Sequence, residues 1–212
     1  MKELILLSGL GADKRVFDFL DLKEYNVTYV EWISPLRNES IENYSRRLLS
    51  QIKVQKPILI GVSFGGIMAI EIGKWIDAEK IILISSAHTK KDIPLYYRLI
   101  GLLKINQLLP SSFLKAINSI TFWFFGVKTT AEKDLLRSFI RQTDSAFLKW
   151  AIDKIVNWKS EMELSNVITI HGTHDRLLPN KKTDYQINKG GHLMIMNKSK
   201  EINAVLKKLL GE

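Results

Sequence analysis

The run PILIGVSFGGIMAIEIG, which begins at Pro57, constrains the fold of this chain more than any other segment. Its two ends are apolar and its middle is rich in glycine, so most of it must be buried. One hydroxyl, that of Ser63, lies between Gly61 and Gly65. The apolar residues before Ser63 predict a strand buried on both faces, and those after it predict a helix. The chain must therefore turn sharply from strand to helix at a serine.

Strand and helix patterns alternate over the first 87 residues and resume after residue 165. The patterns predict strands at Glu3–Ser8, Asn26–Trp32, Ile58–Val62, Lys80–Ser85 and Asn166–His171, and a short polar strand at Asp184–Ile187. The helical signals predict a cap at Asp13, a helix capped by Ser40, a helix over Phe64–Trp75 and a last helix capped by Asn197 or Ser199. This alternation is typical of an α/β fold, in which helices cover both faces of a mostly parallel sheet.

Residues 88–160 differ from the rest because they carry few strand signals. We interpret 1–212 as one domain and 88–160 as a helical insertion within it, with a helix over Ala131–Trp150. An aromatic run, TFWFFG, contains Trp123. It predicts either the apolar core of the insertion, which we favour, or the wall of a substrate pocket.

The segment Gly61–Gly65 reads G-V-S-F-G and matches the G-x-S-x-G pattern of a nucleophilic serine on a strand-to-helix turn. The turn is so tight that a side chain at either glycine would collide with the neighbouring strand or helix. The serine also lies at a helix N-terminus, where backbone N–H groups favour developing negative charge. The structural alternative is a tight turn with an incidental serine.

A serine needs a neighbouring base to become a nucleophile, and the base needs a carboxylate to orient it. Among four histidines, His192 follows Gly190 and Gly191 and precedes the last helix, so a flexible turn could bring it over the sheet. Asp175 follows a buried strand. The order Ser63, Asp175, His192 is the order in which this type of turn uses its acid and base.

Three motifs in this order make the chain resemble the α/β-hydrolase superfamily over nearly its whole length. They are GVSFGG around Ser63, HGTHDRLLP around Asp175 and GGH ending at His192. The resemblance implies a fold of mostly parallel strands with a helical lid, placed here at residues 88–160. It also implies an oxyanion hole made by two backbone N–H groups, those of Leu10 and Phe64.

The chain departs from the family pattern in three places. Ser8 stands where the turn of the oxyanion hole usually has a histidine. The segment between Asp175 and His192 is short, so we expect the helix of this region to be reduced to a turn at Leu178–Lys182. The whole chain is also small for the family.

These residues together predict a serine hydrolase that cleaves a small carboxylic ester. Ser63 would attack, His192 would move the proton and Asp175 would orient the imidazole, with no cofactor and no metal. A thioesterase or acyl transferase would share these residues, and so would a hydrolase of C–C bonds. A ligand-binding protein of low turnover is a further alternative, because the fold does not determine the function.

The remaining histidines have weaker signals. His88 and His174 are candidates for the substrate pocket, together with Trp123 of the aromatic run. We interpret His171, at the end of a strand, as structural. A metal site made by His171, His174 and Asp175 is conceivable, but the H-x-x-H spacing on a turn is weak support for one.

The formal net charge of +9 raises the question of a nucleic-acid partner. The basic residues are scattered, with 12 Lys and Arg against 7 Asp and Glu in residues 88–165, and they indicate a lysine-rich surface rather than a nucleic-acid site. No apolar run is long enough to span a bilayer, so we expect no membrane partner. Disulfides are excluded because the chain has no cysteine. We expect a cytoplasmic protein with a small-molecule ester as its partner; the oligomeric state stays open.

Overall fold

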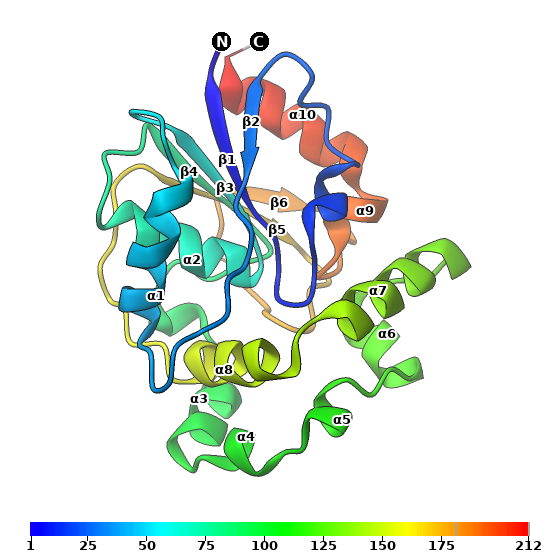
Figure 1. Ribbon diagram of the computed structural model, residues 1–212. Helices are drawn as coiled ribbons and strands as arrows, with labels where there is room; N and C mark the ends of the chain where they lie inside the picture. The colour runs from blue at the N-terminus through cyan, green and yellow to red at the C-terminus, as the bar shows by residue number, and fades with distance from the viewer. Residues whose placement is uncertain (181, 212) are drawn as a thin grey trace.

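The computed structural model describes residues 1–180 and 182–211. Within them one parallel sheet has the order β2-β1-β3-β4-β5-β6 (Figure 1). Its strands are β1 (Glu3–Leu7), β2 (Asn26–Tyr29), β3 (Ile58–Val62), β4 (Lys80–Ile84), β5 (Val167–Gly172) and β6 (Tyr185–Ile187). The α/β prediction and all six predicted strands are confirmed, with some ends displaced by a few residues.

The strands are apolar because both faces of the sheet are covered. Along β1, Leu4 and Leu6 pack into one core while Ile5 and Leu7 pack into the other, as the alternation of side chains requires. Helices α1 (Ile41–Leu48) and α2 (Phe64–Gly73) contribute to the core of Ile5, and α9 (Met194–Asn197) and α10 (Ser199–Leu210) to that of Leu4. The central strand β3 is buried over its whole length.

The caps of these helices test the predicted boundaries. Ser40 accepts a hydrogen bond from the Asn43 N–H and caps α1, and Asp13 caps a short 3-10 helix at Lys14–Phe17, so both predictions are confirmed. The predicted cap of the last helix is wrong. Lys198 occupies that position and makes no side-chain capping bond. Two further 3-10 helices lie at Leu49–Gln51 and Lys90–Asp92.

Helices fill the segment between β4 and β5 in the described chain. They are α3 (Leu95–Leu102), α4 (Ile105–Leu108), α5 (Ser111–Leu114), α6 (Ser119–Phe125), α7 (Thr130–Gln142) and α8 (Ser145–Val156). The prediction of one helix over Ala131–Trp150 is wrong, because the chain breaks between α7 and α8. Thr143 is extended there, and the Asp144 carboxylate accepts the Phe147 N–H at 2.8 Å to begin a new helix.

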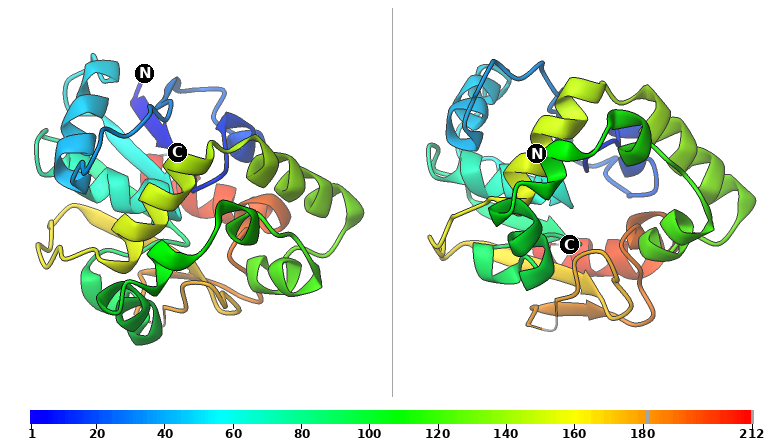
Figure 2. Two further views of the ribbon diagram at one scale, coloured as in Figure 1. Left: turned by 60° about the horizontal axis from the view of Figure 1, so that its bottom comes forward. Right: turned by 90° about the horizontal axis from the view of Figure 1, so that it is seen from below.

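The helical insertion (residues 88–160) lies beyond the carboxyl ends of the strands, at the end of the molecule away from both termini (Figure 1). Seen from below, its helices run around that end of the sheet (Figure 2, right). In the described residues no helix is both long enough and apolar enough to span a bilayer.

Candidate active site

Ser63 lies on the turn between β3 and α2, and the glycines around it are required by close packing. Its backbone has φ +53° and ψ −120°, a conformation that costs free energy and must be held by its surroundings. A side chain at Gly61 would collide with the first turn of α2, and one at Gly65 would collide with the carbonyl groups of Leu7 and Ser8. These collisions are the ones that the sequence pattern predicts.

Two hydrogen bonds link Ser63 to His192 and His192 to Asp175, residues that lie far from Ser63 along the chain. The Nε2 atom of His192 lies 2.8 Å from Ser63 Oγ, and the Nδ1 atom of His192 lies 2.9 Å from Asp175 Oδ2. His192 and Asp175 are 1% and 5% exposed, whereas Ser63 is half-buried. The structure therefore brings the three residues singled out in the sequence into one hydrogen-bonded series, with the hydroxyl at its accessible end.

Three hydrogen bonds and one close histidine contact hold the Asp175 carboxylate. Oδ1 accepts the backbone N–H groups of Leu177 and Leu178, each at 2.9 Å. Oδ2 accepts His192 and also lies 3.1 Å from Nε2 of His171. Burial by itself raises the pKa of Asp175, but the two histidines outweigh burial and hold this pKa well below its usual range. Asp175 is therefore ionised and fixed in orientation.

His171 is the residue whose place the sequence reasoning missed. It is buried, as expected for a structural histidine, and its Nε2 also lies 2.6 Å from the carbonyl oxygen of Leu178. The same nitrogen faces Asp175 Oδ2, so His171 contacts the acid directly. The sequence signal that could have predicted this contact was the position of His171, four residues before Asp175 at the end of a buried strand.

The turn after β1 shows how the chain manages without the usual histidine. The Ser8 hydroxyl donates to the carbonyl oxygen of Ala12 at 2.9 Å and accepts the Trp32 indole N–H at 3.0 Å. The Ala12 N–H donates to Gly9 at 3.0 Å and closes the turn. Ser8 thus braces the loop that carries Leu10.

The two N–H groups that the sequence assigns to an oxyanion hole are those of Leu10 and Phe64. Neither donates a hydrogen bond to another group in residues 1–180 and 182–211. Leu10 lines the same small cavity as Ser63, and Phe64 is the first residue of α2. Neither N–H group is therefore engaged within the described residues.

The helical insertion holds the His192 loop through the end of α6. The Leu193 N–H donates to the Phe125 carbonyl at 3.0 Å, and the Phe125 ring lies edge-on to the His192 ring at 5.7 Å. Gly126 and Gly191 meet so closely that a Cβ atom on either would lie within 2.9 Å of the other. The end of α6 therefore packs against His192 and its loop, and this packing positions the imidazole ring.

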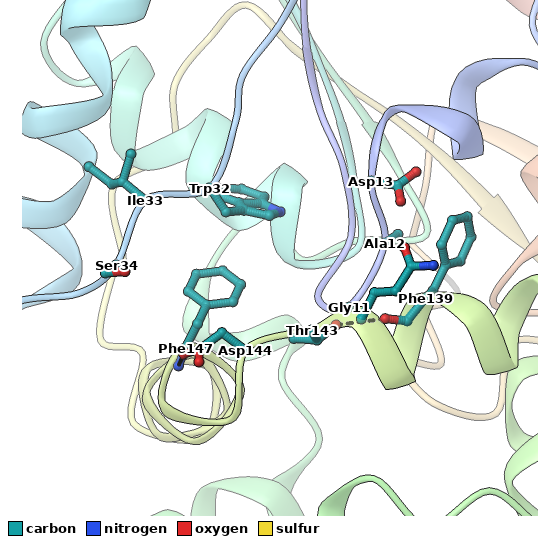
Figure 3. Close-up of a pocket in the computed structure, with 11 residues that line it drawn as sticks. Gly11, Ala12, Asp13, Trp32, Ile33, Ser34, Phe139, Thr143, Asp144 and Phe147 are labelled. Carbon is teal, nitrogen blue, oxygen red and sulfur yellow. Dashed lines mark hydrogen bonds between the residues drawn. The ribbon is translucent and has the colours of Figure 1, made fainter.

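Two neighbouring cavities adjoin this site. The one beside Ser63 has a volume of about 20 Å³ and is walled by apolar side chains that include Phe125, Leu136 and Ile140. A larger one of about 280 Å³ shares Gly11, Ala12 and Phe139 with it. Figure 3 shows the larger cavity, with Trp32 and Phe147 on one side and Phe139 with Ala12 on the other.

The comparisons with known proteins identify the fold. No family model and no curated protein matches the chain. It is similar to the structures of a bromoperoxidase from Bacillus anthracis (16% identity, TM-score 0.70) and an esterase from Exiguobacterium antarcticum (15% identity, TM-score 0.70), covering 100% of this chain and 92% of each of those. It is also similar to a meta-cleavage product hydrolase from Pseudomonas fluorescens (15% identity, TM-score 0.69), with 99% and 90% covered. The chain has the α/β-hydrolase fold.

The α/β-hydrolase fold accounts for the order of the motifs along this chain. Its neighbours carry names of different reactions, so the likeness does not select a substrate. The expected shortening between Asp175 and His192 fits the structure, because the described residues between β5 and β6 contain no helix. One residue of the predicted turn Leu178–Lys182, Lys181, lies outside the described residues.

The pocket residues predicted from the sequence lie outside the two cavities described above. His88, Trp123 and His174 line none of the cavities described above. His174 is exposed, and Trp123 is 55% exposed with the Arg176 guanidinium stacked on its ring at 4.3 Å. The aromatic run is divided instead: Phe122 is buried in the core, and Phe125 alone of the run lines the cavity beside Ser63.

A metal site finds no support in the described residues, where no group of three or more His, Cys, Asp or Glu is placed to hold an ion. His171 and Asp175, two of the ligands considered from the sequence, are engaged with Leu178 and with each other.

Proposed function

We propose that this protein is a serine hydrolase that cleaves a small carboxylic ester through an acyl-enzyme intermediate. The hydrogen-bonded series Ser63–His192–Asp175 carries the proposal. In such a series an imidazole accepts the hydroxyl proton as the oxygen attacks, and a buried carboxylate stabilises the imidazolium that forms. The names of several structural neighbours, among them an esterase and a lipase, are consistent with this chemistry.

The reaction proceeds in two stages. Ser63 Oγ attacks the ester carbonyl carbon while His192 Nε2 takes its proton, and the carbonyl oxygen becomes an oxyanion. The tetrahedral intermediate collapses, and His192 returns the proton to the departing alcohol. A water molecule then attacks the acyl-serine, again losing its proton to His192, and the free acid and Ser63 hydroxyl are restored.

The oxyanion is stabilised by the N–H groups of Leu10 and Phe64. These donors are fixed by the backbone, one on the turn braced by Ser8 and the other at the first turn of α2. Donors that are already in place cost no reorganisation when the charge develops, and each contributes about 3–4 kcal/mol of barrier lowering in comparable sites.

Covalent labelling and turnover test the proposal together. Wild-type protein is treated with a fluorophosphonate and assayed with p-nitrophenyl acetate for an initial burst. We expect label on Ser63 and a burst of one equivalent, with both lost in Ser63→Ala. The matched control is His174→Ala, which changes an exposed histidine outside the cavities and leaves turnover within about twofold. Near-wild-type turnover in Ser63→Ala would contradict the proposal.

The same assay separates the alternatives. Turnover of a thioester or of a C–C substrate that exceeds ester turnover, with Ser63 still required, would move the assignment to those reactions. Labelling without turnover on any of them would indicate a ligand-binding protein that retains the serine site.

A further inference from the structure

Large exposed apolar side chains are concentrated in one segment of the helical insertion. Of the fifteen large apolar side chains that are exposed in the described residues, ten lie between Leu95 and Trp123, nine of them on α3–α6 and one, Leu103, directly after α3. Leu102 is 74% exposed, Leu108 is 82% exposed and Phe113 is 64% exposed. Isolated surface leucines are ordinary, but a concentration of exposed apolar side chains in one segment is typical of an interaction surface. We call this group the α3–α6 face.

The packing of α3 and α4 explains why these side chains point to solvent. Helix α3 rests on α8 through Gly101, where a Cβ would lie 2.7 Å from the Val156 carbonyl oxygen. Helix α4 is tied to α8 by the Asn106 amide, which donates to Asp153 at 2.9 Å. Tyr97 of α3 also packs, partly buried, against the core, whereas Leu95, Leu99 and Leu102 of the same helix remain exposed. In Figure 2 (right) these helices lie at the end of the molecule that faces the viewer.

The charge of the face is of one sign. The chain has 22 Asp and Glu residues, yet none lies between Ile93 and Val127. The basic residues in this segment are Arg98, Lys104 and Lys115. Arg98 and Lys104 are exposed and form no ion pair within the described residues, while Lys115 donates to the carbonyl oxygen of Thr143. The face therefore presents apolar side chains together with unpaired positive charge.

We propose that the α3–α6 face docks on the surface of an anionic lipid bilayer. Exposed leucines can enter the boundary between headgroups and acyl chains, and Arg98 and Lys104 can bind lipid phosphates. Tyr96 and Trp123, both exposed, are the residue types that settle at this boundary. The expectation of no membrane partner came from the absence of a spanning segment, and docking at the surface needs none.

A second copy of the chain fits this face less well than a lipid surface. Two copies related by a twofold axis would bring like charges of Arg98 and Lys104 toward one another, with no carboxylate in the segment to compensate. A bilayer with anionic headgroups supplies the missing negative charge. If the proposed ester hydrolysis is correct, docking would also bring Ser63 close to esters dissolved in lipid, but the binding itself does not depend on that activity.

Vesicle sedimentation of the full chain tests the proposal without any substrate. The vesicles contain phosphatidylcholine alone or phosphatidylcholine mixed with phosphatidylglycerol. We expect the wild type to bind the mixed vesicles more tightly and to lose part of this binding at high salt. The double variant Leu102→Asp/Leu108→Asp should lower the partition coefficient by at least about tenfold. Arg98→Ala/Lys104→Ala should weaken binding to the mixed vesicles and leave binding to phosphatidylcholine unchanged.

The control is Leu36→Asp, which changes a leucine that is 59% exposed in the loop before α1, outside the 95–123 segment, and should bind like the wild type. Circular dichroism melting confirms that each variant is folded. Ser63→Ala should bind vesicles normally, so a failure of the proposed hydrolysis and a failure of docking are distinguishable. Absence of wild-type binding to mixed vesicles would overturn the proposal. So would a dimer in sedimentation velocity that only the leucine variant dissociates, because the face would then join two copies.

Discussion

Asp175 is the residue on which the electrostatics of the site depend. Its carboxylate faces two histidines and two backbone N–H groups, and its pKa is held well below the usual range. An ionised acid keeps His192 with its proton on Nδ1, which leaves Nε2 free to accept the Ser63 proton. In Asp175→Asn the amide can donate a hydrogen bond to Nδ1, which favours the tautomer with the proton on Nε2. We expect kcat to fall by about a thousandfold or more, measured with p-nitrophenyl acetate.

The lowered pKa of Asp175 also makes a prediction for stability. A carboxyl group with a depressed folded pKa stabilises the native state above its unfolded pKa of about 3.9, and this contribution is lost as the pH falls toward the folded pKa. The stability difference between wild type and Asp175→Asn should be constant at neutral pH. Below about pH 4 it should shrink, by at most about 1.4 kcal/mol per pH unit. Urea unfolding of both proteins across this range measures it, and a difference that grows on acidification would contradict the assignment.

His171 gives a second prediction at this scale, as a positioning residue for the acid. Its Nε2 faces both the Leu178 carbonyl oxygen and Asp175 Oδ2. A glutamine side chain retains an N–H donor near this place, whereas leucine removes it. We expect His171→Gln to keep kcat within about fivefold and His171→Leu to lose about tenfold or more, with KM nearly constant. The two variants should also differ in their pH–rate profiles, because His171 acts on Asp175 and Asp175 acts on His192. If His171 had a purely structural role, both variants would melt at a lower temperature and their pH–rate profiles would be the same.

At the scale of elements, the Ser8 hydroxyl links the turn after β1, which carries the proposed oxyanion donor Leu10, to the segment after β2. Ser8→Ala leaves the Ala12 carbonyl and the Trp32 indole without their partner, so we expect a stability loss of about 1–3 kcal/mol. Because the turn that carries Leu10 is loosened, kcat should also fall by about tenfold while KM changes little. The measurements are urea unfolding and steady-state kinetics.

Trp32→Phe serves as the control for this prediction. It removes the indole donor but leaves the bond from Ser8 to Ala12, so kcat should stay within about threefold of the wild type. Equal losses in both variants would show that the brace acts through the packing of Trp32 and not through the turn.

The elements also show which parts of the structure a sequence can predict. The strands were predictable because buried parallel strands have apolar side chains on both faces, and the glycines around Ser63 because their Cβ atoms would collide with backbone. The break between α7 and α8 was not, since Thr143 interrupts an otherwise helical pattern and only the Asp144 cap reveals it. The outward position of Trp123 was equally hidden, because helical spacing does not say which face meets the core.

Contacts across the whole molecule determined the rest of the site. Phe125 lies beside His192 only because the end of α6 packs on Gly191, and Phe139 lines both cavities only because α7 crosses the turn after β1. Phe139 belongs to no motif, and the aromatic run that contains Phe125 did not show which of its rings faces the cavity. Sequence patterns therefore located the three hydrogen-bonded residues Ser63, His192 and Asp175, and the packing of the insertion on the sheet determined the space around them.

The last prediction concerns that space. The cavity of about 280 Å³ is lined by aromatic rings from the segment after β2 and from the helical insertion, among them Trp32 and Phe147. It adjoins the cavity beside Ser63. An acyl group buried there gains about 25 cal/mol for each Å² removed from water. We expect kcat/KM for p-nitrophenyl esters to rise from two to about six acyl carbons and then to level off as the cavity fills. Phe147→Ala enlarges the cavity and should move the optimum to longer chains, at a stability cost of about 3–5 kcal/mol that melting curves must show to be tolerated. Trp123→Ala, which removes an exposed ring outside the cavity, should leave the chain-length profile unchanged. A profile that responds to Trp123→Ala and not to Phe147→Ala would place the acyl group against α6 instead.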